Sequence, residues 1–322
     1  MKPLCSDGIS GTWGAVLLPL NADDSIDFVA LAEQVQAMLE AGLAGIYTNG
    51  TAGELHEQDE AEFDRVSVLV AEACTRRAVP FQIGVGHMSA RVARERLRRV
   101  VALRPGAVQV ILPDWVPVTP SEAERFLLTM AELAAPVGLV LYTPGHAKRP
   151  LDLAAVARLR TAVSALVGVK TPDGNASWYA SMRRLLPGFS VFVPGHHLAT
   201  GLRSGANGSY SNVAALSPRG AQRWFNLCVK DPAAGLAFEQ RLLAFFQDQV
   251  APLAAQGLCS AALDKALAAA GGWAPIPPRL RWPYQSADAA AVARLGRAAR
   301  AALPELWDEA VGASVSSRKI PS

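Results

Sequence analysis

Lys170, Tyr142 and Thr51 are the residues of this sequence whose types and positions suggest covalent chemistry. Lys170 closes the apolar run 165–169, and it alone among the six lysines interrupts a strand-like segment. Lysine is rarely buried without a partner, and loss of water disfavours the ammonium form, which makes the amine a nucleophile for ketones. The structural alternative is a lysine whose stem follows the strand while its ammonium reaches water.

Tyr142 and Thr51 supply two complementary groups. Tyr142 ends the preceding strand-like run, and neighbouring strands lie about 4.8 Å apart, so its phenol can exchange protons beside the amine. Thr51 lies in the turn 48–54, Thr-Asn-Gly-Thr-Ala-Gly-Glu, whose backbone N–H groups and hydroxyl suit a carboxylate, although a tight turn also needs glycine for its geometry alone. A carboxylate pocket, an amine and a phenol together fit an α-keto acid, which predicts a lysine-dependent aldolase or lyase.

Strand-like and helix-like segments alternate along the first two thirds of the chain. The expected strands are 14–19, 45–48, 81–85, 108–112, 137–142, 166–170, 190–193 and 208–211, and the expected helices between them are 28–41, 57–73, 90–103, 121–134, 153–162 and 178–186. Such alternation indicates parallel strands joined by right-handed crossovers, and eight units in roughly 250 residues favour a closed barrel. No glycine-rich dinucleotide fingerprint follows the first strand, which disfavours an open doubly wound sheet.

The sequence therefore predicts an α/β protein with three regions. Residues 1–215 form a TIM (β/α)8 barrel that carries the active site, residues 216–313 form a C-terminal helical region, and residues 314–322 form a polar tail. The helices expected in the C-terminal region are 218–228, 232–251, 259–270 and 289–303. Reactive groups of such a barrel lie at the C-terminal ends of its strands, where Lys170 and Tyr142 both fall.

Bulk composition excludes several function classes. The net charge is only +3, and the basic stretch 91–99 is interrupted by Glu95, so we expect a solvated helix face and no nucleic-acid binding. The four cysteines are widely spaced without a zinc pattern, which predicts reduced thiols and no metal. No apolar stretch is long enough for a membrane helix, and no signal peptide is recognisable, so we expect a cytoplasmic protein without membrane contact.

Taken together, these motifs resemble the dihydrodipicolinate synthase and N-acetylneuraminate lyase family of pyruvate-dependent Schiff-base enzymes. The segment 50–54 is similar to the family's Gly-Thr-Thr-Gly-Glu motif, Tyr142-Thr143-x-Gly resembles its tyrosine motif, and 168–175 resembles the segment that holds its lysine. The resemblance implies that Lys170 forms the imine, that Tyr142 relays protons, and that Thr51 and the Ala52 amide hold the carboxylate. It further implies pocket contacts at Gly195 and Tyr210, no cofactor, and a homo-oligomer, either a tetramer or a dimer.

Three departures from the family pattern bear on the substrate. Ala52 stands where the synthases carry a second threonine, and Pro113-Asp114-Trp115 occupies the place of the tyrosine pair that completes their hydroxyl relay across a subunit contact. The synthases' arginine for the second carboxylate has no match in 142–150. These differences argue against true dihydrodipicolinate synthesis, and Trp115 would give a larger apolar wall that suits a bulkier aldehyde.

Other possibilities follow from the same residues. One is a hydratase-aldolase acting on an arylidene-pyruvate-like substrate, and another is a non-catalytic keto-acid binding protein on the same scaffold. His196 and His197 follow Gly195 and invite a metal interpretation, but adjacent residues of an extended segment point to opposite sides. We therefore expect one of them to donate a hydrogen bond to a substrate and neither to bind a metal.

Overall fold

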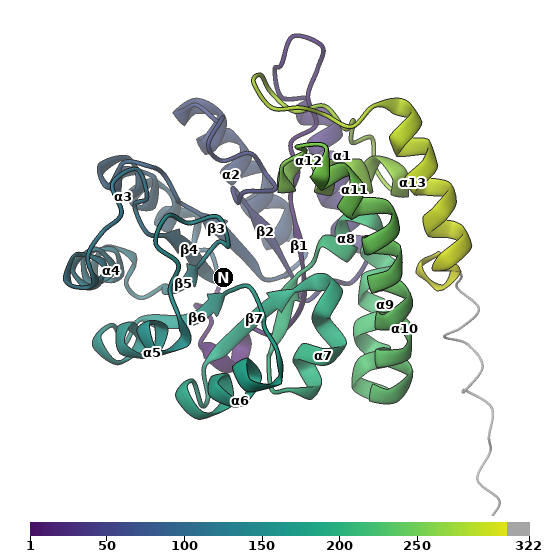
Figure 1. The fold of residues 1–322 in the computed structure, drawn as a ribbon. Coiled ribbons are helices and arrows are strands. Elements are labelled where there is room, and N and C mark those ends of the chain that lie inside the picture. Colours follow the sequence, from purple (N-terminus) through teal and green to yellow (C-terminus); the bar gives the residue numbers. More distant parts are fainter. Residues whose placement is uncertain (308–322) are drawn as a thin grey trace, which may run out of the picture.

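A closed barrel of eight parallel strands forms the centre of the molecule. The computed structural model describes residues 1–307 (Figure 1). Each strand pairs with the next along the chain, and β8 pairs with β1 to close the barrel, which confirms the predicted fold class. The strands are β1 (Gly11–Ala15), β2 (Gly45–Thr48), β3 (Phe81–Gly84), β4 (Ala107–Ile111), β5 (Gly138–Tyr142), β6 (Leu166–Lys170), β7 (Ser190–Pro194) and β8 (Gly208–Tyr210).

Helices surround this barrel, and side chains at their first turns fix where several begin. Asp27 caps α1, and Asp59 and Thr119 each form a reciprocal capping box with a glutamate three residues later at the starts of α2 and α4. Pro120 follows Thr119 as the first residue of α4, as the sequence predicts. The helices are α1 (Phe28–Glu40), α2 (Glu60–Arg76), α3 (Ala90–Val100), α4 (Pro120–Ala134), α5 (Leu153–Ala162), α6 (Ala176–Leu185), α7 (Leu198–Arg203) and α8 (Asn212–Leu216).

The first strand differs from the prediction. β1 begins and ends earlier than expected, because Trp13 pairs with Gly45 of β2 while the apolar residues from Leu17 onward leave the sheet. One of them, Leu17, is buried against Ala268 of the C-terminal region. The apolar character of 17–19 therefore reflects burial and not strand pairing.

A second group of helices covers one side of the barrel, and Figure 1 shows them gathered there from green to yellow. They are α9 (Pro218–Lys230), α10 (Pro232–Phe245), a π-helical turn (Phe246–Val250), α11 (Ala251–Ala255), α12 (Ser260–Gly271) and α13 (Ala289–Ala302). Their apolar cluster includes residues of α7 and α8, so the expected boundary at residue 215 falls inside a shared core. The expected tail 314–322 lies outside the described residues. Within residues 1–307, no helix has the length and apolar character needed to cross a bilayer.

Candidate active site

Lys170 and Tyr142 face each other at the C-terminal mouth of the barrel. They are direct partners in the pairing of β5 with β6. The Lys170 Nζ lies 4.0 Å from the centroid of the Tyr142 ring. Both side chains are half-buried. Strand register thus brings the predicted amine and phenol together.

Two further tyrosines complete the surroundings of the amine. The Nζ of Lys170 lies 5.3 Å from the ring centroid of Tyr210 and 5.7 Å from that of Tyr47. Both rings are buried inside the barrel, where their hydroxyls donate hydrogen bonds to Gln82 and Gln109 respectively. Burial raises the pKa of both phenols, so they stay neutral. Tyr210, expected as a pocket contact, therefore contributes its ring, and Tyr47 was missed because it reads as an ordinary core aromatic.

The turn after β2 is shaped by close approach of the chain to this aromatic floor. A Cβ at Gly50 would lie 2.3 Å from Cε1 of Tyr47, and one at Gly53 would lie 2.9 Å from the carbonyl oxygen of Val16. Only glycine fits at either place. Thr51, between them, lines the cavity at the mouth, and Ala52 packs on an apolar cluster with α12. The glycines have a steric role, and the threonine remains available to a ligand.

Gly195 also sits where no side chain fits. A Cβ there would lie 2.8 Å from Cα of Ser211 and 2.7 Å from Oδ1 of Asn212. The residue begins a short 3-10 turn (Gly195–His197) after β7. Its backbone lies at the mouth beside β8, where the resemblance places a pocket contact.

A cavity of about 600 Å³ opens at the mouth next to the Thr51 turn. Its walls combine apolar side chains with histidines, and the lining includes Thr51, Leu55, His56, His87, Met88, Ile111, Leu112, Asp114, His146, Ser260, Ala261 and Tyr284. Burial lowers the pKa of His56 and His87, which favours neutral rings. Trp115, expected to wall the pocket, is absent from this lining, and its side chain is 72% exposed. Its ring lies 4.9 Å from the ammonium of Lys148 on the outer side of the loop.

His196 and His197 differ from the extended arrangement that we expected. They lie in the 3-10 turn with ring centroids 4.4 Å apart, so both rings fall on one side. His196 bonds to Asn212, and burial lowers its pKa to about 4, whereas His197 Nδ1 lies 3.6 Å from a carboxylate oxygen of Asp173. Across the described chain, residues 1–307, no group of three or more histidine, cysteine or acidic side chains is arranged to hold a metal ion.

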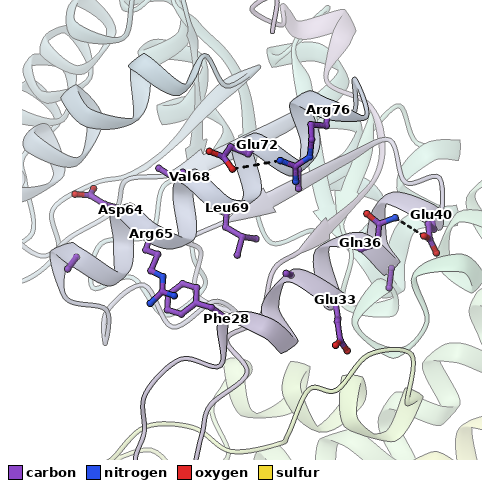
Figure 2. A pocket seen from close by; sticks show the side chains of 14 residues that line it. Phe28, Glu33, Gln36, Glu40, Asp64, Arg65, Val68, Leu69, Glu72 and Arg76 are labelled. Atoms are coloured by element: carbon purple, nitrogen blue, oxygen red, sulfur yellow. Dashed lines mark hydrogen bonds and ion pairs between the residues drawn. The ribbon is translucent and has the colours of Figure 1, made fainter.

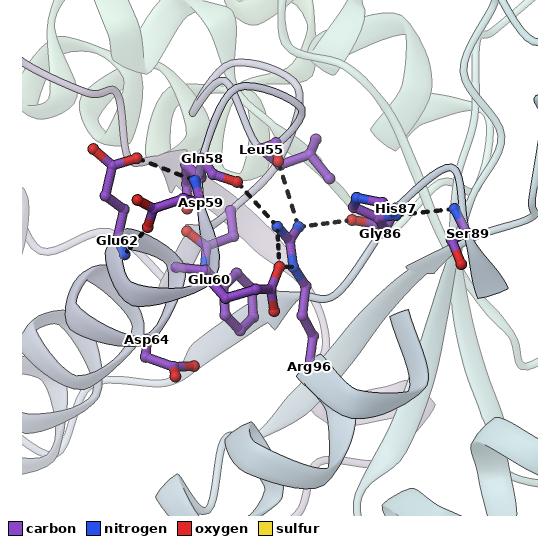
Figure 3. A network of polar contacts seen from close by, with 12 residues as sticks. Leu55, Gln58, Asp59, Glu60, Glu62, Asp64, Gly86, His87, Ser89 and Arg96 are labelled. Atoms are coloured by element: carbon purple, nitrogen blue, oxygen red, sulfur yellow. Dashed lines mark hydrogen bonds and ion pairs between the residues drawn. The ribbon is translucent and has the colours of Figure 1, made fainter. Parts of the chain in front are cut away.

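Arg96 holds two loops of the mouth in place (Figure 3). Although it lies in the basic stretch that we expected to be solvated, its side chain is buried and stacks over the ring of Phe63 at 4.5 Å. Its Nη1 donates to the carbonyl oxygens of Gly86 at 3.1 Å and Leu55 at 3.4 Å, and its Nε donates to Glu60 at 2.9 Å. Gly86 and Leu55 both line the mouth cavity, so this guanidinium fixes one of its walls.

A larger hollow lies away from the mouth. The groove between α1 and α2 measures about 1010 Å³ and is lined by residues such as Phe28, Glu33, Arg65 and Glu72 (Figure 2). Arg65 stacks on the ring of Phe28 at 3.6 Å. No strand end reaches this outer groove, so we place the chemistry at the barrel mouth.

The C-terminal region closes the mouth through α12. Lys265 of this helix forms an ion pair with Glu54 of the β2 turn, and both side chains are completely buried. The backbone N–H of Arg281 also donates to Glu54 at 3.2 Å. The neighbouring Asp264 lies within reach of the Lys170 charge, and burial raises its pKa to about 6. Neither Asp264 nor the Glu54 pair could be recognised from local sequence, because Lys170 and Lys265 lie far from them along the chain.

Comparisons with known proteins agree with this geometry. The model of the dihydrodipicolinate synthetase family matches residues 8–298. The chain belongs to this family. Its relatives include 4-hydroxy-tetrahydrodipicolinate synthases from Sorangium cellulosum, 28% identical over 82% of this chain and 91% of the relative, and from Methylococcus capsulatus, 30% identical over 74% and 83%.

A solved structure shares the fold. YagE, a prophage protein of the dihydrodipicolinic acid synthase family from Escherichia coli K12 crystallised with pyruvate, superposes with a TM-score of 0.81 at 21% identity, covering 91% of this chain and 98% of its own. As a member of the dihydrodipicolinate synthetase family, the chain is a lyase or aldolase.

Proposed function

We propose that this enzyme forms a Schiff base between Lys170 and pyruvate or a related α-keto acid, and makes or breaks a carbon–carbon bond to an aldehyde. The observation that carries the proposal is the contact of the Lys170 Nζ with the Tyr142 ring at 4.0 Å, near Tyr47, on which the turn that carries Thr51 packs. Family membership supports it, as does the pyruvate complex of YagE.

Each residue of the mouth has a step to perform. The unprotonated Lys170 amine attacks the ketone carbon of pyruvate, and a proton from the Tyr142 hydroxyl lets the former ketone oxygen leave as water, which gives the protonated imine. The Thr51 hydroxyl and the Ala52 N–H hold the carboxylate, and the Gly195 backbone offers a further contact. The rings of Tyr47 and Tyr210 form the floor.

The aldehyde partner would occupy the cavity of about 600 Å³. Asp114 and the neutral rings of His56 and His87 stand there, and no arginine among residues 1–307 lines it, so a second carboxylate on the substrate would lack an arginine partner. This argues for a neutral aldehyde and against dihydrodipicolinate synthesis. The apolar walls at Leu55, Ile111 and Leu112 favour, as a second candidate, a hydratase-aldolase acting on a bulky arylidene-pyruvate-like substrate.

Borohydride reduction in the presence of pyruvate tests the proposal. We expect a single covalent adduct, located at Lys170 by peptide mass spectrometry and absent from Lys170→Arg. In Tyr142→Phe the adduct should form about a hundredfold more slowly, because proton transfer to the leaving oxygen is lost.

A panel of α-keto acids that leaves the wild-type enzyme unmodified would refute the proposal. Saturable pyruvate binding that survives in Lys170→Arg, with no adduct in the wild type, would instead establish a non-catalytic binding protein.

A further inference from the structure

Asp264 lies on the face of α12 that is turned toward the barrel mouth. Ser260 and Ala261, one turn earlier, line the mouth cavity, and Ala268, one turn later, shares an apolar cluster with Ala52. Residues three and four apart lie on one face of a helix, so Ala261, Asp264 and Ala268 are aligned. The Asp264 side chain is therefore placed between the aldehyde cavity and the carboxylate turn.

The positive charge of Lys170 influences the ionisation of Asp264. Burial raises the pKa of Asp264 to about 6, and the positive charge of Lys170 opposes part of that rise. The Asp264 side chain is half-buried, so part of it remains accessible. An acid that titrates near neutral pH is suited to proton transfer.

Three other carboxylates near the mouth are already engaged. Glu54 pairs with Lys265, Asp173 accepts a hydrogen bond from a tyrosine of α6, and Asp114 accepts from a backbone N–H of the β5–α5 loop. Asp264, in contrast, has no hydrogen bond or ion pair with any side chain among residues 1–307. It does not cap α12 either, because it lies past the first turn. A half-buried carboxylate without a structural partner is a candidate for function.

Asp264 would supply an acid–base group that the other described residues of the mouth lack. Ala52 carries no hydroxyl, and within residues 1–307 the Tyr142 hydroxyl has no protein hydrogen-bond partner through which to pass a proton onward. The carbon of the imine that becomes nucleophilic must face the aldehyde cavity, and Asp264 lies one turn along α12 from Ser260 and Ala261, which line that cavity, and within reach of the Lys170 charge.

We infer that Asp264 is a catalytic acid–base residue of this enzyme, which removes the proton from the methyl carbon of the Lys170–pyruvate imine and later delivers it to the aldehyde oxygen. This rests on the proposed function. The methyl C–H bond breaks and its proton passes to the Asp264 carboxylate. The C–H electron pair becomes the C=C bond, and the C=N pair moves onto nitrogen to give the neutral enamine. The enamine carbon then bonds to the aldehyde carbon, and the aldehyde oxygen takes the proton from Asp264.

Pyruvate alone suffices for the test, because enamine formation exchanges its methyl protons with solvent. Asp264→Asn keeps the volume of the side chain and removes the base. In D₂O we expect deuterium incorporation into pyruvate to fall a hundredfold or more, followed by NMR, while the borohydride adduct at Lys170 stays within about twofold of wild type. If Asp264→Asn perturbs folding, Asp264→Ser must show the same result, a loss of deuterium exchange with the borohydride adduct retained.

Asp248→Asn is the matched control, because Asp248 is an exposed aspartate of the same helical region, and it should exchange at the wild-type rate. Exchange that persists in Asp264→Asn with the adduct intact would overturn this inference and leave the proposed function standing. If a folded Asp264→Asn variant loses adduct formation and deuterium exchange to the same extent, the inference is also overturned. Asp264 would then be needed for imine formation by the Lys170 amine and not for removal of the methyl proton. Absence of any adduct in the wild type would overturn the proposed function itself.

Discussion

Single side chains at the mouth differ in what they contribute. Tyr142 and Lys170 meet because they end neighbouring strands in register, whereas Tyr47 and Tyr210 point into the barrel and bond to glutamines there. A tyrosine at the end of a strand therefore does not have one fixed role. Its position along the strand decides whether its hydroxyl faces ligand or core.

Asp264 should make stability depend on pH. Its pKa is raised to about 6 from an ordinary 3.8, so the folded protein binds this proton more tightly than the unfolded chain. The stabilising effect of the bound proton is complete below about pH 4 and is lost as pH rises through about 6. Asp264→Asn, which cannot ionise, should thus be more stable than wild type at pH 8, by up to about 2 kcal/mol once solvent screening is allowed for.

Urea unfolding at pH 4.5 and pH 8 measures this difference. The gain should shrink toward zero at the lower pH, and Asp248→Asn should show none at either. An equal gain at both pH values would mean that burial of the charge is not its cause.

The helices and loops of the mouth depend on buried charges. Glu54 lies on the β2 turn and Lys265 on α12, and both are completely buried, so each charge relies on the other. Removing one member of such a pair leaves the other uncompensated in a medium that solvates it poorly.

Lys265→Met should therefore destabilise the protein by about 3–5 kcal/mol, and the double change Glu54→Gln with Lys265→Met should recover most of that loss. Denaturant unfolding of wild type, both single variants and the double variant gives the coupling energy directly. A cost below about 1 kcal/mol for Lys265→Met would show that the pair does not fasten α12 to the turn.

The sequence predicted the bounds of helices and strands better than it predicted which distant residues contact one another. β6 has the expected bounds and most helices begin within a few residues of them, because apolar periodicity and caps are local signals. The short helices α7 and α8 were missed, since each has too few residues to show a period. Lys170 and Tyr142 followed from strand order, but Asp264 could not, because its role depends on how α12 packs across the barrel.

At the scale of the whole molecule, one exposed apolar segment suggests association. Trp115 and Val116, adjacent in the loop after β4, are 72% and 75% exposed. We expect wild type to exceed the 34.0 kDa of one chain in light scattering, and Trp115→Ala with Val116→Ser to reduce that mass. Trp282→Ala is the control, because Trp282 is 83% exposed in a different loop and should leave the mass unchanged. A wild type of single-chain mass would refute the expectation.

The pairing of Glu54 with Lys265 has a consequence during synthesis of the chain. The barrel strands leave the ribosome well before α12, so a nascent chain holds Glu54 with no cation to meet it. The turn that carries Thr51, although it packs on Tyr47 and Val16, then lacks the buried ion pair that ties it to α12 until the C-terminal region arrives. Translation that stops after the eighth strand would yield a chain with every strand of the barrel and an unfinished mouth, which makes premature termination a loss of activity even where the lysine is present.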